Sequence, residues 1–172
     1  MGNLVADAML ARVADQGVEI AIQNSGGLRA SIDAGEVTMG EVLAVLPFQN
    51  TLSTFQVSGA ELIEALENGV SQIEKAAGRF PQVAGMTFTV DPKAEVGSRI
   101  SNVMVSGMPI DPEKTYGMVS NNYVRNGGDG YATFKSAQNA YDYGPDLADV
   151  TAEFIAKNGD YTPYIDGRIK IK

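Results

Sequence analysis

Two glycine-rich loops carry the residues of this sequence best suited to binding a small ligand. The first, Asn24 to Arg29, follows a run of alternating apolar residues. Its glycines would let backbone N–H groups approach a ligand closely, and its arginine could hold a phosphate with two hydrogen bonds. The second loop, Asn126 to Gly130, contains Asp129, whose carboxylate could accept hydrogen bonds from a sugar diol. On spacing alone, the simpler explanation of the first loop is an ordinary turn with a surface arginine, and that of the second loop is a β-hairpin turn.

Two aromatic residues stand next to predicted loops. Phe48 follows a proline at an element boundary, and Tyr123 lies shortly before the second glycine-rich loop. Such rings could stack on the two faces of a nucleobase, at about 1–3 kcal/mol for each stack. Burial in the core is the alternative, and aromatic residues are more often buried than used for ligands.

The composition excludes several classes of function. The 172 residues include no histidine and no cysteine, which rules out a Ser-His-Asp triad, thiol catalysis, disulfides and His- or Cys-based metal sites. A metal site or acid–base pair made of carboxylates alone stays open. The net charge of -8 disfavours a nucleic acid polymer as partner, although one arginine in a pocket could still hold a small anion.

Short signatures of other chemistry are also missing. There is no Walker A loop, GxGxxG, GxSxG elbow or EF-hand loop, and we find no signal peptide or membrane span. The chain runs into a helical pattern directly after Met1, so we expect it to be part of a longer protein.

The pattern of apolar residues predicts one domain over residues 1–172 in which helices and strands mix without strict alternation. Capping boxes at Thr38/Glu41 and Ser58/Glu61 mark two helix starts. Helices are expected at about 3–15, 39–45, 59–73 and 145–157, and strands at 18–22, 51–57, 83–90, 100–105 and 116–120. Segment 78–82 is interpreted as a connection and 106–109 as a turn, with Asp111, Asp142 and Asp146 as turn or cap residues. This order favours an α+β fold with a mixed sheet over a doubly wound parallel sheet.

Five motifs in a fixed order resemble a known family. They are Gly2–Ala8, Asn24–Arg29, Leu46–Thr51, Gly78–Val83 and Asn126–Tyr131. Together they are similar to the C-terminal domain of the 5′-nucleotidase / UDP-sugar hydrolase / 2′,3′-cyclic phosphodiesterase family, from residue 2 to about 135. The resemblance implies that family's C-terminal domain fold, with helices packed on mixed sheets.

The resemblance also implies how this chain takes part in a reaction. The family's enzymes convert a nucleotide to a nucleoside and phosphate. Two divalent metal ions and an Asp-His pair belong to an N-terminal metallophosphoesterase domain that this chain lacks, so no catalytic or metal-binding residue is assigned here. The expected partners are a nucleoside or nucleotide and that N-terminal domain in cis. The isolated chain is expected to be inactive, and the full-length protein to be periplasmic or extracellular.

Site residues are implied by the resemblance position by position. Phe48 and Tyr123 match the aromatics that sandwich the base; the second is often phenylalanine, so Tyr123 adds a hydroxyl. Arg29 matches an arginine near the phosphate, and Asp129 the aspartate that binds the ribose hydroxyls. Positions lining the base and sugar are matched by Asn24, Gly27, Asn50 and Gly78. Ser25 replaces a common glycine. The family's other substrate arginines belong just upstream of this chain or in its first turns and are not assigned to residues here, so the phosphate subsite is expected to be incomplete.

Two alternatives remain at this point. Sulfur-oxidising thiosulfohydrolases have a related two-domain plan, but they do not need the aromatic pair Phe48 and Tyr123. A stand-alone ligand-binding module without catalysis would need only this chain.

Overall fold

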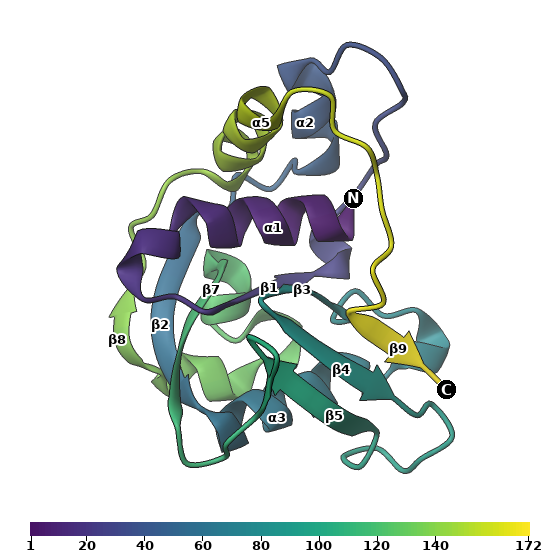
Figure 1. The fold of residues 1–172 in the computed structure, drawn as a ribbon, viewed down its shortest axis with the longest axis vertical. Helices are drawn as coiled ribbons and strands as arrows, with labels where there is room; N and C mark the ends of the chain where they lie inside the picture. Colours follow the sequence, from purple (N-terminus) through teal and green to yellow (C-terminus); the bar gives the residue numbers. More distant parts are fainter.

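The computed structural model describes residues 1–172, which form two β-sheets with helices packed on them (Figure 1). The larger sheet has the strand order β3-β1-β7-β2-β8, and the smaller one β6-β5-β4-β9. Only β1–β7 and β4–β9 pair in parallel, and every other pair is antiparallel. The predicted α+β fold with a mixed sheet is therefore confirmed. The strands are β1 (Ile20–Asn24), β2 (Leu52–Ser58), β3 (Pro81–Ala84), β4 (Met86–Val90), β5 (Ile100–Val105), β6 (Met108–Pro109), β7 (Thr115–Asn121), β8 (Gln138–Tyr141) and β9 (Ile169–Ile171).

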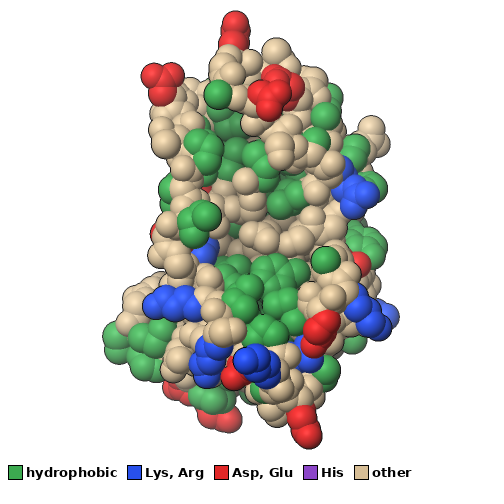
Figure 2. All heavy atoms as spheres, turned by 90° about the vertical axis from the view of Figure 1, so that its right-hand side faces the viewer, with side chains coloured by type: hydrophobic (Ala, Val, Ile, Leu, Met, Phe, Trp, Pro, Cys, Tyr) green, Lys and Arg blue, Asp and Glu red, His purple; other side chains and the backbone are tan.

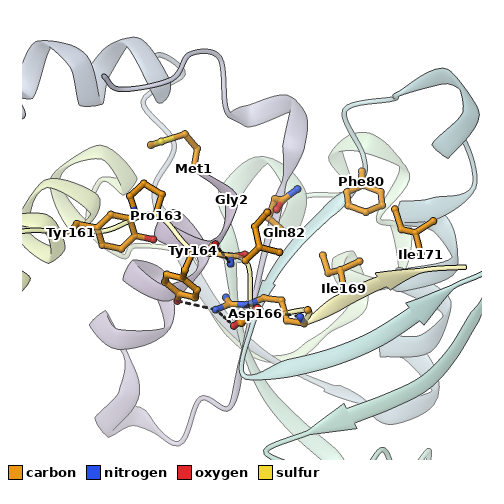
Figure 3. Close-up of a pocket in the computed structure, with 14 residues that line it drawn as sticks. Met1, Gly2, Phe80, Gln82, Tyr161, Pro163, Tyr164, Asp166, Ile169 and Ile171 are labelled. Atoms are coloured by element: carbon orange, nitrogen blue, oxygen red, sulfur yellow. Dashed lines mark hydrogen bonds and ion pairs between the residues drawn. The ribbon is translucent and has the colours of Figure 1, made fainter. Parts of the chain in front are cut away.

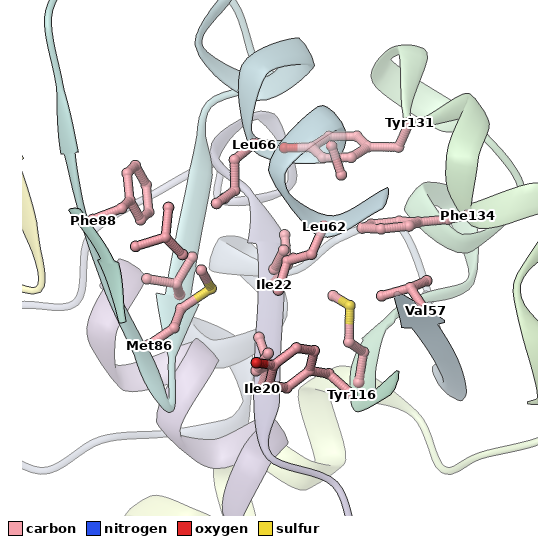
Figure 4. Close-up of a cluster of buried hydrophobic side chains, with 14 of the residues drawn as sticks. Ile20, Ile22, Val57, Leu62, Leu66, Met86, Phe88, Tyr116, Tyr131 and Phe134 are labelled. Atoms are coloured by element: carbon pink, nitrogen blue, oxygen red, sulfur yellow. The ribbon is translucent and has the colours of Figure 1, made fainter. Parts of the chain in front are cut away.

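The larger sheet lies between two hydrophobic layers. Along β1, Ala21 faces a cluster with α1 (Gly2–Arg12), α2 (Met39–Val45) and α5 (Leu147–Asn158). Its neighbours Ile20 and Ile22 face the opposite cluster, which includes α3 (Gly59–Val70) and the smaller sheet (Figure 4). All of β1 is buried, because successive side chains of a strand point to opposite faces and both faces are covered here.

Local capping signals determine where the helices begin. Thr38 and Ser58 both form the predicted capping boxes, so α2 and α3 start at the expected residues. Asp146 caps α5 by accepting hydrogen bonds from two backbone N–H groups, which confirms its structural role. A short helix, α4 (Asn122–Arg125), follows β7. None of the helices is both long and apolar enough to cross a lipid bilayer.

The single strand predicted over 83–90 is wrong. Gly85 divides it, with β3 in the larger sheet and β4 in the smaller one. Gly85 has φ 76°, and a Cβ there would collide with the carbonyl oxygen of Glu19. Glycine is therefore needed for the chain to pass from one sheet to the other.

Other element boundaries also differ from the prediction. Helix α1 ends at Arg12 and α3 at Val70, each followed by a short 3₁₀ turn. The predicted turn over 106–109 includes the two residues of β6, and β8 and β9 were not expected.

The C-terminal segment is fastened to α1 by charged and polar groups. Arg168 donates to Asp7 at 2.7 Å and to the carbonyl oxygen of Val83 at 2.8 Å. Its second terminal nitrogen donates to Asp166 at 2.8 Å, and the Tyr164 hydroxyl donates to Asp7. The hydrogen bond from Arg168 lowers the pKa of Asp166 below its usual range. Tyr164, Asp166 and Arg168 line a cavity together with apolar side chains (Figure 3). Figure 2 shows the side of the molecule on which β9 lies in Figure 1, where hydrophobic side chains are surrounded by charged ones.

Candidate ligand-binding site

One cavity brings together all eight residues predicted for the site. Its volume is about 550 Å³, a size that suits a small molecule such as a nucleoside. Gly26 is its one further lining residue. The nine lining residues are Asn24, Gly26, Gly27, Arg29, Phe48, Asn50, Gly78, Tyr123 and Asp129.

The two aromatic residues of the cavity are exposed. Phe48 is 56% exposed and Tyr123 48%, so the alternative that both rings belong to the core is wrong. Phe48 lies just after α2, and Tyr123 is in α4. Exposed aromatic rings in a concave site are available to stack on a planar ligand.

Reciprocal hydrogen bonds hold the segments that carry these aromatic residues together. The backbone N–H of Thr51 donates to Asn122 Oδ1 at 3.2 Å, and the N–H of Asn122 donates to the Thr51 carbonyl at 2.9 Å. The segment after α2 is also anchored to α5, because the N–H of Leu147 donates to the Asn50 carbonyl at 2.8 Å. The positions of the two rings are thus set by the backbone of several elements.

The first glycine-rich loop leaves the carboxyl end of β1 and turns across the cavity. The N–H of Gly26 donates to the carbonyl of Gly78 at 2.8 Å, which joins this loop to the segment before β3. The Arg29 side chain is exposed and donates to the Gly26 carbonyl at 3.2 Å. Ser25 does not line the cavity, and its hydroxyl accepts a hydrogen bond from Gln82 at 2.8 Å.

The second glycine-rich loop is a 3₁₀ turn after α4, and not the hairpin that its sequence favours on its own. Asp129, at its centre, has the left-handed backbone φ of 54°. Its Oδ2 accepts from Asn24 Nδ2 at 2.7 Å and its Oδ1 from the Tyr123 hydroxyl at 3.1 Å. Its carbonyl accepts from Asn68 at 3.1 Å, so the carboxylate and the backbone of Asp129 are both fixed.

Three buried polar side chains next to the cavity form a hydrogen-bonded group that was not predicted from the sequence. Asn121 Nδ2 donates to Asn24 Oδ1 at 2.9 Å and to Gln23 Oε1 at 2.8 Å, and both Asn121 and Gln23 are buried. Gln23 and Asn24 end β1, and Asn121 ends β7. Polar residues at the carboxyl ends of two neighbouring parallel strands are a signal of a site, but the pairing of β1 with β7 has to be known first.

The cavity offers aromatic surface, amide groups, one cation and one anion. Arg29 is the charged group suited to a phosphate, and Asp129 is an acceptor suited to hydroxyl groups. The chain has no cluster of three or more acidic residues that could hold a metal ion. The metal centre that the resemblance implies belongs to the N-terminal domain, and no chemical step is assigned to the residues of this chain.

Comparison with known proteins gives consistent results. The family described as "5′-nucleotidase, C-terminal domain" matches residues 1–136. The trifunctional nucleotide phosphoesterase protein YfkN of Bacillus subtilis is 41% identical over 99% of this chain, which covers 12% of that protein. The crystal structure of a 5′-nucleotidase precursor from Thermus thermophilus is 42% identical, with a TM-score of 0.96 over 99% of this chain and 34% of that one.

A more distant structural neighbour shares the fold alone. The sulfate thiohydrolase SoxB of Thermus thermophilus is 21% identical, with a TM-score of 0.76 over 98% of this chain and 31% of that one. In all three comparisons this chain spans about a third or less of the length of the known protein.

Proposed function

Because this chain belongs to the family of 5′-nucleotidase C-terminal domains, we propose that its cavity binds the nucleoside part of a nucleotide substrate. The observation that carries the proposal is the single cavity shared by Phe48, Tyr123, Arg29 and Asp129. Two exposed rings suit a planar base, and a fixed carboxylate suits a sugar diol. Arg29 suits a phosphate.

We assign the remaining lining residues to the walls around the base and sugar. The amides of Asn24 and Asn50 can donate to and accept from polar ligand atoms. Gly27 and Gly78 leave room for a ligand to approach the backbone. The site thus consists of Asn24, Gly27, Arg29, Phe48, Asn50, Gly78, Tyr123 and Asp129.

We further propose that residues 1–172 form one substrate-binding domain of a longer phosphohydrolase that converts nucleotides to nucleosides and phosphate. In the whole protein, an N-terminal metallophosphoesterase domain would hold two divalent metal ions and supply the hydrolytic chemistry. Its location would be periplasmic or extracellular. These proposals rest on the family, since this chain covers only 12% of YfkN and 34% of the Thermus 5′-nucleotidase precursor.

Calorimetric titration of the purified chain with adenosine and AMP tests the binding proposal. We expect saturable binding that weakens about 5- to 150-fold in each of the variants Phe48→Ala and Tyr123→Ala, since one base stack contributes about 1–3 kcal/mol. Tyr143→Ala is the matched control, because this ring is 85% exposed and does not line the cavity. Binding that survives the double variant Phe48→Ala/Tyr123→Ala would contradict the assignment of the base site.

The thiosulfohydrolase alternative has the fold in its favour but not the site. A substrate without a base would leave the exposed rings of Phe48 and Tyr123 without a function.

Metal-dependent release of phosphate from AMP by the purified chain alone would contradict the proposal that catalysis belongs to another domain.

A further inference from the structure

The hydroxyl group of Tyr123 makes two hydrogen bonds, and both are to Asp129. The hydroxyl donates to Asp129 Oδ1 at 3.1 Å and accepts from the Asp129 backbone N–H at 3.2 Å. A hydroxyl group has one hydrogen to donate, so this donor is fully used inside the protein. The Tyr123 side chain in α4 is thereby connected to the carboxylate of Asp129 in the turn that follows α4.

The second oxygen of Asp129 is held from the opposite side. Asn24 donates to Oδ2 at 2.7 Å, and its own Oδ1 is held by Asn121 at 2.9 Å. Asn24 and Asn121 are both buried at the ends of their strands, so this side of the carboxylate is anchored to the larger sheet. The Tyr123 hydroxyl is the corresponding donor at the solvent side.

These two donors decide which lone pairs of Asp129 remain for a ligand. A carboxylate has about four acceptor positions, and a donor at each oxygen leaves about one on each oxygen. Two free positions on adjacent oxygens match the two hydroxyl groups of a vicinal diol. A phenylalanine at position 123 would keep the aromatic surface, but it would free Oδ1 to turn and leave the Asp129 N–H without its partner.

We propose that the Tyr123 hydroxyl is a positioning group for Asp129, through which this ring makes the site selective for ribonucleosides over 2′-deoxyribonucleosides. The inference rests on the proposed function, because it presumes that the cavity binds a nucleoside. It assigns two separate contributions to one side chain. The ring contributes affinity for any base, and the hydroxyl contributes the preference for an intact diol.

The Tyr123 ring also packs against the second glycine-rich loop, and this contact does not depend on the hydroxyl group. A Cβ at Gly128 would lie 2.5 Å from Tyr123 Cε1, so the ring already rests against the loop backbone. Removing the hydroxyl leaves this contact in place. The main change in Tyr123→Phe is therefore the loss of the two hydrogen bonds between the Tyr123 hydroxyl and Asp129.

Calorimetry with adenosine and 2′-deoxyadenosine tests the inference in four forms of the 172-residue chain. These are the unsubstituted protein, Tyr123→Phe, Asp129→Asn and the double variant. The measured quantity is the ratio of the two dissociation constants. We expect Tyr123→Phe to weaken the binding of adenosine more than that of 2′-deoxyadenosine, and so to lower the preference for adenosine about 2- to 10-fold, the value of one hydrogen bond.

The double variant shows whether the hydroxyl acts through Asp129. Asparagine tolerates the left-handed backbone of position 129 but replaces one carboxylate oxygen with a donor. We expect the preference to be small in Asp129→Asn and unchanged when Tyr123→Phe is added. Tyr131→Phe is the matched control, because it removes a buried hydroxyl of the same segment that donates to the Arg79 carbonyl and lies outside the cavity.

The outcomes distinguish this inference from the proposed function. Equal weakening of both nucleosides in Tyr123→Phe, or a further change of the ratio in the double variant, would overturn the positioning role while nucleoside binding stands. The absence of any preference in the unsubstituted protein would overturn it as well. No binding of adenosine to the unsubstituted protein would overturn the proposed function and the inference together.

Discussion

Gly26 and Gly78, which both line the cavity, contact each other through their backbones. A Cβ added to either residue would lie 2.9 Å from the Cα of the other, closer than backbone atoms allow. The first glycine-rich loop and the segment before β3 therefore depend on two facing glycines for their separation.

Gly78→Ala should push these two segments apart. We expect a loss of about 1–3 kcal/mol in the free energy of unfolding, since neither backbone can move without disturbing its hydrogen bonds. Adenosine binding should weaken too, because Asn24 and Gly27 move with the loop. Urea denaturation and calorimetry measure the two effects.

Gly40→Ala is the control for that variant. It lies in α2, and the nearest atom to its added Cβ is 3.8 Å away. We expect it to be neutral or stabilising, as alanine is favoured over glycine in helices by about 1 kcal/mol. Equal stability of Gly78→Ala and Gly40→Ala would argue against the close contact.

Arg29→Ala should affect a nucleotide more than a nucleoside. Its guanidinium is the one cation of the cavity, and we expect affinity for AMP to fall about five- to tenfold while affinity for adenosine stays the same. Arg12→Ala removes the same charge from an exposed position outside this cavity, so it controls for the effect of the protein's net charge on the binding of an anionic ligand. Equal losses for AMP and adenosine would show that Arg29 does not contact the phosphate.

Gly85→Ala should be among the most destabilising small substitutions in this protein. Its left-handed backbone costs a side chain about 1–2 kcal/mol, and the collision with the Glu19 carbonyl adds about as much again. Gly97 also has a positive φ, of 91°, but a Cβ there meets no atom within 4 Å. Thermal denaturation should therefore show a smaller loss for Gly97→Ala, and equal losses would refute the role of the collision.

Acid should weaken the attachment of the C-terminal segment. The hydrogen bond from Arg168 lowers the pKa of Asp166 in the folded state. The contribution of this ion pair to the free energy of unfolding is therefore complete above the ordinary aspartate pKa of about 3.9, and it is lost as the pH falls through the lowered pKa. We expect Asp166→Asn to lose no more than about 1 kcal/mol at pH 7, because this carboxylate is 41% exposed and screened.

The pH dependence separates this ion pair from other effects of the substitution. The difference between Asp166→Asn and the unsubstituted protein should shrink below about pH 3.9, which urea denaturation at several pH values measures. Asp160→Asn, a nearby exposed carboxylate, should show no such trend. A difference that persists unchanged in acid would contradict the ion pair.

Local signals in the sequence predicted α1, α2, α3 and α5, but not the one-turn helix α4. In each capping box the two residues, Thr38 and Glu41 or Ser58 and Glu61, are close in the sequence, so the box can be recognised without knowledge of the fold. Strands were harder. The division at Gly85 depends on a carbonyl far away in the sequence, and all four residues of β8 are exposed, so its pattern shows no buried face.

The eight residues of the candidate site came from the family resemblance, and spacing alone favoured simpler explanations for most of them. The bond from Asn24 to Asp129 joins positions 105 residues apart, which periodicity cannot reveal. The supporting amides of Gln23 and Asn121 were missed for the same reason. Their role depends on β1 and β7 lying side by side.

The parallel pairing of β1 with β7 has a consequence for how the chain reaches its native state. Ser120 and Ile22 bond across these strands although 98 residues separate them, and the last strand, β9, pairs in parallel with β4. Such connections form only after a long loop has closed, which slows folding of mixed α/β proteins relative to helical bundles. During synthesis on the ribosome, neither sheet can be completed until the strands from β7 onward have emerged, and the smaller sheet is completed only when β9 (Ile169–Ile171) has emerged.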